Sequence, residues 1–213
     1  MVRKIKVVGI SPSPSLITCR ALEEIRRAKV VVLLERDLPF SLEDLLKGKH
    51  VVYLEPAYDK PLEEKQKVYE RNWAKLSEIG EDEVVWLEVG DPSIRNPIER
   101  HTLGNLGNLE VEFVPGVSSV TAVLDRLRVI AKHLCVFGGE ELERIEKAVE
   151  ACDLFVIINV KDRRALDLLK SKGYDVTLVE NCCTDNERVV KDFGEVTTYW
   201  VIAVAKRHDK SSF

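Results

Sequence analysis

Four apolar, strand-like runs in the sequence end in residues whose types suit the binding of a ligand by the main chain. These ends are Gly9-Ile10-Ser11-Pro12-Ser13-Pro14, Gly90-Asp91-Pro92, Val114-Pro115-Gly116 and Glu180-Asn181. Glycine lets main-chain groups come close to another atom, and proline fixes the direction in which the chain leaves. Each such end is expected to be either an ordinary turn or a wall of a binding site.

The end at Gly90-Asp91-Pro92 follows the apolar run "EVVWLEV" and leaves two interpretations open. Gly90 would let the backbone approach a ligand without an intervening Cβ atom. Asp91 can accept hydrogen bonds from an amine or hydroxyl of a ligand, or from the N–H groups of its own loop. Pro92 fixes the exit and begins a helix. From residue types alone, an ordinary turn is favoured.

The chemistry-bearing residue types do not form a recognisable catalytic set. No convincing Ser/His/Asp or Cys/His constellation occurs, and neither G-x-G-x-x-G nor G-x-x-x-x-G-K-[ST] is present, so a nucleotide-binding fold is disfavoured. The cysteines show no C-x-x-C pair and no histidine at zinc-ligand spacing. We therefore predict buried free thiols, no metal site and no assignable catalytic residue. The cysteines are Cys19, Cys135, Cys152, Cys182 and Cys183.

Strand-like and helix-like segments alternate along nearly all of the 213 residues, which predicts an α/β protein with largely parallel sheets. Two domains are expected, residues 1–114 and 115–213. In such sheets, ligands bind at the carboxyl ends of strands. Strands are predicted at 5–10, 29–35, 50–55, 83–89, 109–114, 133–138, 153–159, 175–181 and 199–205. Helices are predicted at 15–28, 41–48, 61–80, 97–103, 140–151 and 162–172, with a further helix after Pro115-Gly116.

The composition, with 45% apolar and 32% charged residues, is typical of a globular protein. A net charge of -4 argues against a nucleic-acid-binding protein, since such domains are usually basic. No run approaches the roughly 18 apolar residues of a membrane span, and the basic-apolar N-terminus is too short for a signal peptide. A cytoplasmic protein is expected. The abundance of Lys, Arg and Glu is typical of thermophiles.

From end to end, the chain resembles the tetrapyrrole (cobalamin and sirohaem) methylases, which transfer a methyl group from S-adenosylmethionine. The segment "VVGISPSPSLITCRALEEIRRAKVVV" is similar to the family's opening strand, loop and first helix. "VGDP", "VEFVPGVSS" and "LVENCCTDNERVV" resemble three further signature segments, in the same order and spacing. The resemblance implies two α/β domains with an active-site cleft between them.

Within the family, "VVVLLERDLPF" and "ENCCTDNERVV" most resemble the precorrin-6Y methylase branch, whose cobalt-pathway activity is carbon-5 methylation of cobalt-precorrin-7. Two segments depart from the family pattern. The first loop normally reads G-x-G-P-G, but Ser11 and Ser13 occupy this loop here. Because serine at positive φ is strained, we expect this loop to follow another path. After Gly90-Asp91-Pro92, the aromatic residue and further glycine that often follow are replaced by Ser93-Ile94-Arg95-Asn96-Pro97.

The resemblance implies S-adenosyl-L-methionine as cofactor, S-adenosyl-L-homocysteine as product and a homodimer. Plainer roles remain open: Ser118 and Ser119 can cap the following helix, and Cys182 can be a small buried residue. The positions that match the family's cofactor pocket are Pro12, Val89, Gly90, Asp91, Ile94, Ser118, Ser119, Ile158 and Cys182.

The acceptor in this family is a tetrapyrrole macrocycle bearing many carboxylates. Arginine suits such a ligand, because its guanidinium group binds a carboxylate through two parallel hydrogen bonds. Arg36 and Arg95 are the predicted substrate-binding residues; Arg100 and His101 lie close in sequence to Arg95. His50 and His133 fall at strand starts, on the opposite edge, and no role is assigned to them.

Two alternatives remain open. The related diphthine synthases methylate a modified histidine on a protein, but they are longer chains with a different segment after the second strand. A non-catalytic relative would bind the cofactor or a partner without turnover, and the altered glycines of the first loop are the feature that supports it.

Overall fold

The computed structural model describes residues 2–34, 38, 40–57, 60–94, 96 and 98–208, and the chain divides into two compact units. Unit 1 comprises Met1–Ser118 and unit 2 comprises Ser119–Phe213. The domain boundary that the sequence predicts lies after Val114.

Unit 1 contains a five-stranded sheet with the order β3-β2-β4-β1-β5, and every pairing between neighbouring strands is parallel. The parallel α/β architecture predicted for this half is therefore confirmed. Nearly every residue of β2 and β4 is buried, as expected for strands covered on both faces. The strands are β1 Lys4–Gly9, β2 Val30–Leu34, β3 His50–Leu54, β4 Glu83–Glu88 and β5 Glu110–Val114.

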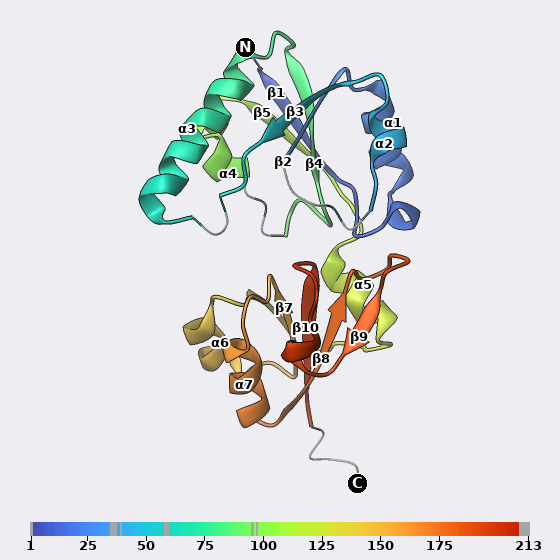
Figure 1. Cartoon of the computed structure of the whole chain (residues 1–213), viewed down its shortest axis with the longest axis vertical. Coiled ribbons are helices and arrows are strands. Elements are labelled where there is room, and N and C mark those ends of the chain that lie inside the picture. Colours follow the sequence, from blue (N-terminus) through green and yellow to red (C-terminus); the bar gives the residue numbers. More distant parts are fainter. Residues whose placement is uncertain are drawn as a thin grey trace. The chain divides into compact units, whose positions relative to one another are not determined.

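Helices cover both faces of this sheet (Figure 1). Alternating strand residues face opposite helices: Val7 and Trp86 pack in one buried cluster, whereas Val8 and Val85 pack in another. The first cluster includes residues of α3 (Leu62–Glu78) and α4 (Ile98–His101), and the second includes residues of α1 (Cys19–Arg27) and α2 (Glu43–Leu46). The described residues of unit 1 also form two short 3₁₀ helices, η1 (Pro14–Leu16) and η2 (Asn105–Asn108).

The first helix begins later than predicted. The expected start was near residue 15, but Pro14–Leu16 form η1, and α1 begins at Cys19. The Thr18 side chain accepts a hydrogen bond from the N–H of Ala21 at 3.1 Å, which caps the helix. Because Thr18 satisfies one of the first free N–H groups, it defines the helix start better than the apolar periodicity does.

Unit 2 contains a mixed sheet with the order β6-β7-β10-β8-β9, in which β6 and β7 pair in parallel. Strand β10 pairs antiparallel with both β7 and β8, and β9 pairs antiparallel with β8. The short strand β9 was not predicted. The elements are α5 Ser119–Arg126, β6 Leu134–Gly138, α6 Leu142–Ala148, β7 Leu154–Ile158, α7 Arg164–Ser171, β8 Tyr174–Glu180, β9 Arg188–Val190, η3 Phe193–Glu195 and β10 Val201–Arg207.

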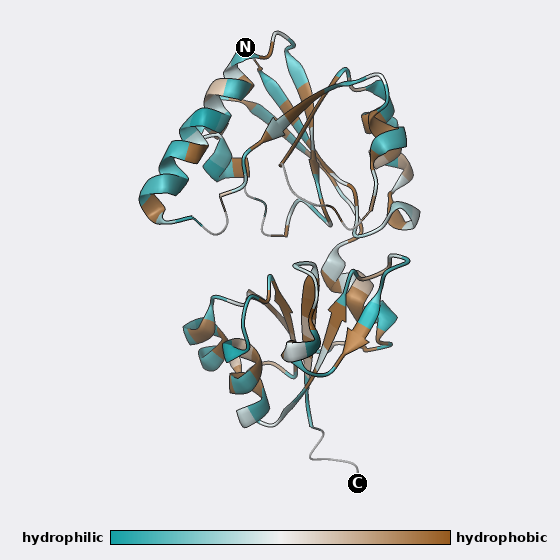
Figure 2. Cartoon of the chain, in the orientation of Figure 1, coloured by the Kyte–Doolittle hydropathy of each residue, from teal (hydrophilic) through white to brown (hydrophobic). Residues whose placement is uncertain are grey.

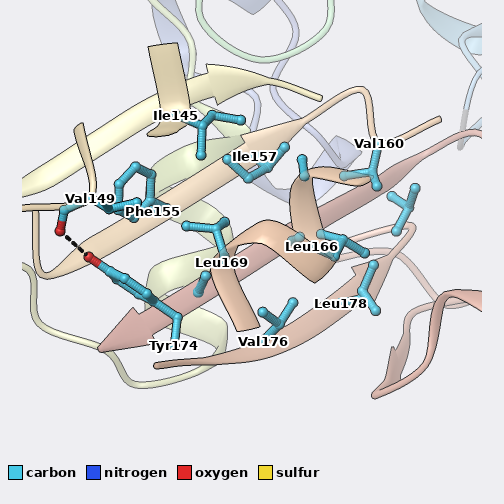
Figure 3. Packing of buried hydrophobic residues seen from close by; sticks show 14 of the residues in the cluster. Ile145, Val149, Phe155, Ile157, Val160, Leu166, Leu169, Tyr174, Val176 and Leu178 are labelled. Carbon is cyan, nitrogen blue, oxygen red and sulfur yellow. Dashed lines mark hydrogen bonds between the residues drawn. The ribbon is translucent and has the colours of Figure 1, made fainter. Parts of the chain in front are cut away.

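The strands of both sheets are predominantly hydrophobic (Figure 2), and in unit 2 they pack against α6 and α7. The side chains of Phe155, Ile157, Leu169 and Leu178 are fully buried there (Figure 3). The Tyr174 hydroxyl donates a hydrogen bond to the Val149 carbonyl oxygen at 2.8 Å, so the polar end of this buried ring is satisfied. The β-branched and aromatic residues of these strands therefore form the core that holds unit 2 together.

A disulfide bond joins Cys135 to Cys152, which corrects the prediction that all five cysteines are free thiols. Strands β6 and β7 pair in parallel with Leu134 opposite Leu154, and this register brings the two Cα atoms to 6.1 Å. Such a separation lies within the range that a disulfide spans. Because the pairing of β6 with β7 creates the contact, cysteine spacing alone could not show it. Cys19, Cys182 and Cys183 are free, but Cys19 is exposed, so the expectation of a buried thiol is wrong for Cys19.

Within the part of the chain that the structure describes, no helix combines the length and apolar character that crossing a membrane requires.

Candidate functional site

The carboxyl ends of β1, β4 and β5 meet at one edge of the first sheet, because β1 pairs in parallel with both neighbours. Each of these ends carries a glycine, and the three glycines are in close backbone contact. A Cβ atom added to Gly9 would lie 2.5 Å from the Gly90 carbonyl oxygen and 2.6 Å from the Gly116 amide nitrogen. Gly90 itself has φ +89°, a conformation that glycine adopts without strain. Three loops that are distant in sequence therefore meet in unit 1.

The Asp91 carboxylate connects two of these loops. One oxygen, Oδ1, accepts a hydrogen bond from the Ser93 amide at 2.9 Å, and the other, Oδ2, accepts one from the Gly116 amide at 3.2 Å. The sequence left two roles open for Asp91. The structure shows the second, in which the carboxylate accepts hydrogen bonds from N–H groups of the loops. Asp91 therefore holds the loop after β4 against the loop after β5.

Ser11 joins the third loop to this arrangement. Its hydroxyl donates to the Leu16 carbonyl oxygen at 2.9 Å and accepts from the Val117 amide at 2.9 Å. Ser11 has φ +61°, so the expectation that a serine would force this loop onto a path without positive φ is wrong. The two hydrogen bonds, made by a fully buried side chain, offset the roughly 1 kcal/mol or more that a left-handed non-glycine residue costs.

Substituting Ser11 is expected to separate backbone strain from hydrogen bonding. Ser11→Ala keeps the strain and loses both hydrogen bonds, so we expect the free energy of unfolding to fall by about 2 kcal/mol. Ser11→Gly loses the same bonds but relieves the strain, so its loss should be smaller by about 1 kcal/mol. Urea unfolding of both variants measures the difference. An alanine variant as stable as the glycine variant would contradict this account of the loop.

The remaining cofactor-pocket predictions in unit 1 lie in or beside these loops. Pro12 is buried and directly follows Ser11, and Val89 is half-buried and directly precedes Gly90. Ile94 is 39% exposed, and its amide donates to the Asp91 carbonyl oxygen at 3.0 Å. Ser118 is half-buried at the end of the loop after β5. The structure thus brings Pro12, Val89, Gly90, Asp91, Ile94 and Ser118 to the same edge of one sheet.

The other three predicted positions, Ser119, Ile158 and Cys182, belong to unit 2. Strands β7 and β8 both run antiparallel to β10, which lies between them, so their carboxyl ends point to the same edge. Ile158 is the last residue of β7, and Cys182 follows β8 by two residues. Cys182 is 5% exposed, consistent with the plainer expectation of a small buried residue. Ser119 is the first residue of α5.

Glu180 anchors the end of β8 before Cys182. It is fully buried, and its Oε1 atom accepts hydrogen bonds from the amides of Thr197 and Thr198 at 2.6 and 2.9 Å. Its Oε2 atom lies 3.0 Å from a guanidinium nitrogen of Arg188. Glu180 therefore connects β8, β9 and the segment before β10.

The predicted substrate-binding residues, Arg36 and Arg95, lie outside the described residues. The neighbouring Arg100 is an exposed residue of α4. His133 forms an exposed ion pair with Asp153, with Nδ1 2.9 Å from the carboxylate, and this pair lowers the pKa of Asp153. No role was assigned to His133, and its pair lies at the strand starts rather than among the loops described above.

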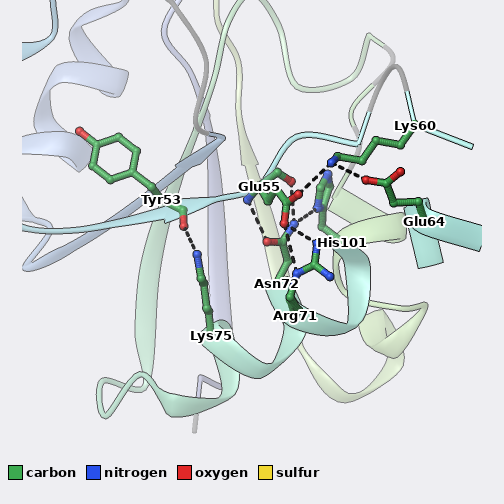
Figure 4. Close-up of polar contacts among 8 residues, drawn as sticks. All are labelled: Tyr53, Glu55, Lys60, Glu64, Arg71, Asn72, Lys75 and His101. Carbon is green, nitrogen blue, oxygen red and sulfur yellow. Dashed lines mark hydrogen bonds and ion pairs between the residues drawn. The ribbon is translucent and has the colours of Figure 1, made fainter. Parts of the chain in front are cut away.

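His101 is a buried structural residue whose hydrogen-bond partner is Asn72, a contact that the sequence does not predict. It is 1% exposed, and its Nδ1 atom lies 2.7 Å from the Asn72 amide nitrogen (Figure 4). Asn72 also accepts from the Glu55 amide through Oδ1 at 2.9 Å and donates to the Glu55 carbonyl oxygen through Nδ2 at 2.9 Å. Because Oδ1 is engaged with an N–H donor, the Asn72 amide nitrogen faces His101, and Nδ1 of the ring must accept.

This environment keeps His101 uncharged. Burial, and secondly the charge of Arg100, lower the pKa of His101 to about 4. The ring packs at 5.0 Å from Tyr69 and 5.8 Å from Trp86, between centroids, so the imidazole lies in an aromatic, apolar surrounding. His101 therefore supports the packing of α3 and α4.

The two units define a class: a parallel α/β sheet whose strand ends meet in glycine-rich loops, followed by a mixed α/β sheet. The family model described as "Tetrapyrrole (Corrin/Porphyrin) Methylases" matches residues 4–196. The chain belongs to this family of S-adenosylmethionine-dependent methyltransferases. No curated protein sequence matches the chain.

Solved structures share the fold at low sequence identity. Precorrin-6Y methylase from Archaeoglobus fulgidus is 24% identical, with a TM-score of 0.70 over 97% of this chain and 99% of that one. Uroporphyrin-III C-methyltransferase from Thermus thermophilus, solved in complex with S-adenosylhomocysteine, is 23% identical, with a TM-score of 0.68 over 95% and 97%. A cobalamin-synthesis-related protein from Corynebacterium diphtheriae is 17% identical, with a TM-score of 0.71 over 97% and 99%.

Proposed function

We propose that the protein transfers a methyl group from S-adenosyl-L-methionine to a carbon of a corrin precursor in cobalamin biosynthesis. The proposed reaction is carbon-5 methylation of cobalt-precorrin-7, the activity of the precorrin-6Y methylase branch. The observation that carries the proposal is the meeting of the loops after β1, β4 and β5, held together by Ser11 and Asp91, in a chain that belongs to the tetrapyrrole methylases. The segments that resemble the precorrin-6Y methylase branch support the choice of substrate.

The proposed cofactor contacts are main-chain groups and small side chains at the positions that match the family's cofactor pocket. In unit 1, the loops at Pro12, Val89–Asp91, Ile94 and Ser118 supply N–H and C=O groups at one sheet edge. In unit 2, Ser119, Ile158 and Cys182 are the proposed contributors. Asp91 acts through the loops: its carboxylate holds the Gly116 amide and thereby fixes the edge that the cofactor would contact.

Bound S-adenosyl-L-methionine supplies a methyl group activated by its positively charged sulfur. The protein's task is then to hold the donor methyl and the acceptor carbon in line, about 3–3.5 Å apart, and to exclude water. No side-chain nucleophile is needed for such a displacement. Loops fixed by hydrogen bonds, like those of Ser11 and Asp91, suit this positioning role.

Arg36 and Arg95 are the proposed contacts for the carboxylates of the macrocycle. The proposal for these two residues comes from their places in the sequence, after the second strand and after the Gly90-Asp91-Pro92 loop. A guanidinium group binds a carboxylate through two parallel hydrogen bonds, which gives both affinity and orientation. A homodimer is proposed from the family resemblance.

Calorimetry followed by a methyl-transfer assay tests the proposal. We expect S-adenosyl-L-methionine to bind at sub-millimolar concentration, and cobalt-precorrin-7 to gain one methyl group by mass spectrometry. Arg95→Ala should weaken use of the acceptor about tenfold or more while cofactor affinity stays unchanged, whereas Arg100→Ala serves as a matched exposed control.

Cofactor binding without methylation of any corrin precursor would favour a non-catalytic relative, and methylation of a modified histidine on a protein would favour a diphthine-synthase-like activity. No binding of the cofactor would exclude both methyltransferase assignments.

A further inference from the structure

One group of potential metal ligands comes together among the described residues, in the turn between β8 and β9. It consists of Cys182, Cys183 and Glu187, whose ligand atoms all lie within 4.8 Å of one another. We propose that this group binds one thiophilic divalent cation of the Zn²⁺ class through two sulfurs and one carboxylate oxygen. The proposal does not depend on the methyl-transfer assignment.

The two sulfurs are placed for a shared ligand. The Sγ atoms of Cys182 and Cys183 lie 3.5 Å apart. Two sulfurs bound to one tetrahedral Zn²⁺ at about 2.3 Å each lie roughly 3.8 Å apart. Neighbouring residues in an extended strand point to opposite sides, but Asn181 and Cys183 have φ +46° and +65°, and this turn brings both thiols together.

Glu187 provides the third ligand from the other side of the turn. Its side chain is only 11% exposed, and its Oε2 atom accepts a hydrogen bond from the Cys183 amide at 2.7 Å. Its Oε1 atom pairs with Arg126 of α5. The carboxylate is thus held beside the thiols, and each of its oxygens retains a second lone pair for a metal ion.

The charges balance when the ion is bound. Burial, and secondly Cys183, raise the pKa of the Cys182 thiol. When the two metal–sulfur bonds form, each thiol releases its proton to solvent. Two thiolates and the Glu187 carboxylate carry three negative charges, which the divalent cation and Arg126 neutralise together. Three protein ligands leave a fourth position for water.

Such an ion would cross-link the β8–β9 turn. Cys182 and Cys183 lie shortly after β8, and Glu187 directly precedes β9. An ion that binds the folded turn and not the unfolded chain raises stability by mass action. We therefore expect Zn²⁺ to raise the unfolding temperature in addition to binding.

The test uses the full chain with Cys19→Ser, which leaves Cys182 and Cys183 as the two free thiols. The buffer contains no reductant, so that the Cys135–Cys152 disulfide is retained. We expect one Cd²⁺ per chain, with a thiolate-to-metal charge-transfer band that Zn²⁺ displaces, and a higher unfolding temperature with Zn²⁺.

Adding Cys182→Ser or Cys183→Ser should weaken binding about 100-fold and remove the band. Adding Glu187→Gln should weaken it about tenfold, whereas Asp185→Asn, an exposed carboxylate of the same turn, should not change it.

A Cys19→Ser protein that shows no band, or a Cys182→Ser variant that keeps it, would overturn the proposal. Circular dichroism of each metal-free variant establishes that the chain is folded before binding is compared. Since no cofactor is present, the result is independent of whether the chain transfers methyl groups.

Discussion

Replacing Gly9 with alanine is expected to disrupt the meeting of the loops after β1, β4 and β5. The added Cβ would lie 2.5 Å from the Gly90 carbonyl oxygen and 2.6 Å from the Gly116 amide nitrogen. Both are main-chain atoms, which cannot move aside as a flexible side chain does. We expect the free energy of unfolding to fall by about 3 kcal/mol, as for overpacked cores. Affinity for S-adenosyl-L-methionine should fall by about 100-fold or more, measured by calorimetry.

Gly107→Ala is the matched control, because a Cβ at Gly107 meets nothing within 4 Å and the residue is not in the left-handed region. This variant should keep both the stability and the cofactor affinity of the parent protein. If Gly9→Ala were unstable yet bound the cofactor normally, the loops would be structural only. If it were as stable as the parent, the close packing of the three glycines would itself be contradicted.

Acidification is expected to cost about 3 kcal/mol of stability through His101 alone. The pKa of His101 is about 4 in the folded protein against 6.5 for an unperturbed histidine. Between these two values the unfolded chain binds more protons than the folded one, so the free energy of unfolding falls as pH falls. The contribution is fully present above about pH 6.5 and is lost as pH approaches about 4; each pKa unit corresponds to about 1.4 kcal/mol. Urea unfolding at several pH values measures this loss.

His101→Gln separates this effect from general acid denaturation. Glutamine does not titrate, and its carbonyl oxygen can accept the hydrogen bond that Asn72 donates to Nδ1 of His101. The variant should therefore lose about 3 kcal/mol less than the parent protein over the same pH range. His133→Gln, at an exposed histidine, should leave the contribution of His101 unchanged. An identical pH dependence for His101→Gln and the parent would exclude His101 as the titrating group.

The sequence alone determined the strands of unit 1 and the residue types that follow their carboxyl ends. Apolar runs of Val and Leu predicted β2 and β4 as strands, and β–α alternation predicted the parallel sheet. The glycines and prolines at Gly9, Gly90 and Gly116 identified the loops of the candidate site. These features are local. Backbone preference depends on the residue type, and the spacing of buried residues is visible within a short segment of the chain.

The sequence also carries a signal for the buried partner of Asn72. Val68, Asn72 and Leu76 follow one another at intervals of four along α3, and all three are buried. A polar residue in such a stripe needs a buried partner, because an unsatisfied amide costs about 1–3 kcal/mol. The sequence therefore indicated that Asn72 has a buried partner, but not that the partner is His101.

Only the tertiary structure decided which distant groups meet. The carboxylate of Asp91 binds the Gly116 amide, Cys135 bonds to Cys152, and β10 inserts antiparallel between β7 and β8. In each case the partner is separated by many residues, and local periodicity reports only that a residue is buried, not what it is buried against. The path of the Ser11 loop also depends on contacts that the local sequence does not show. Hydrogen bonds to Leu16 and Val117 stabilise a conformation that serine by itself disfavours.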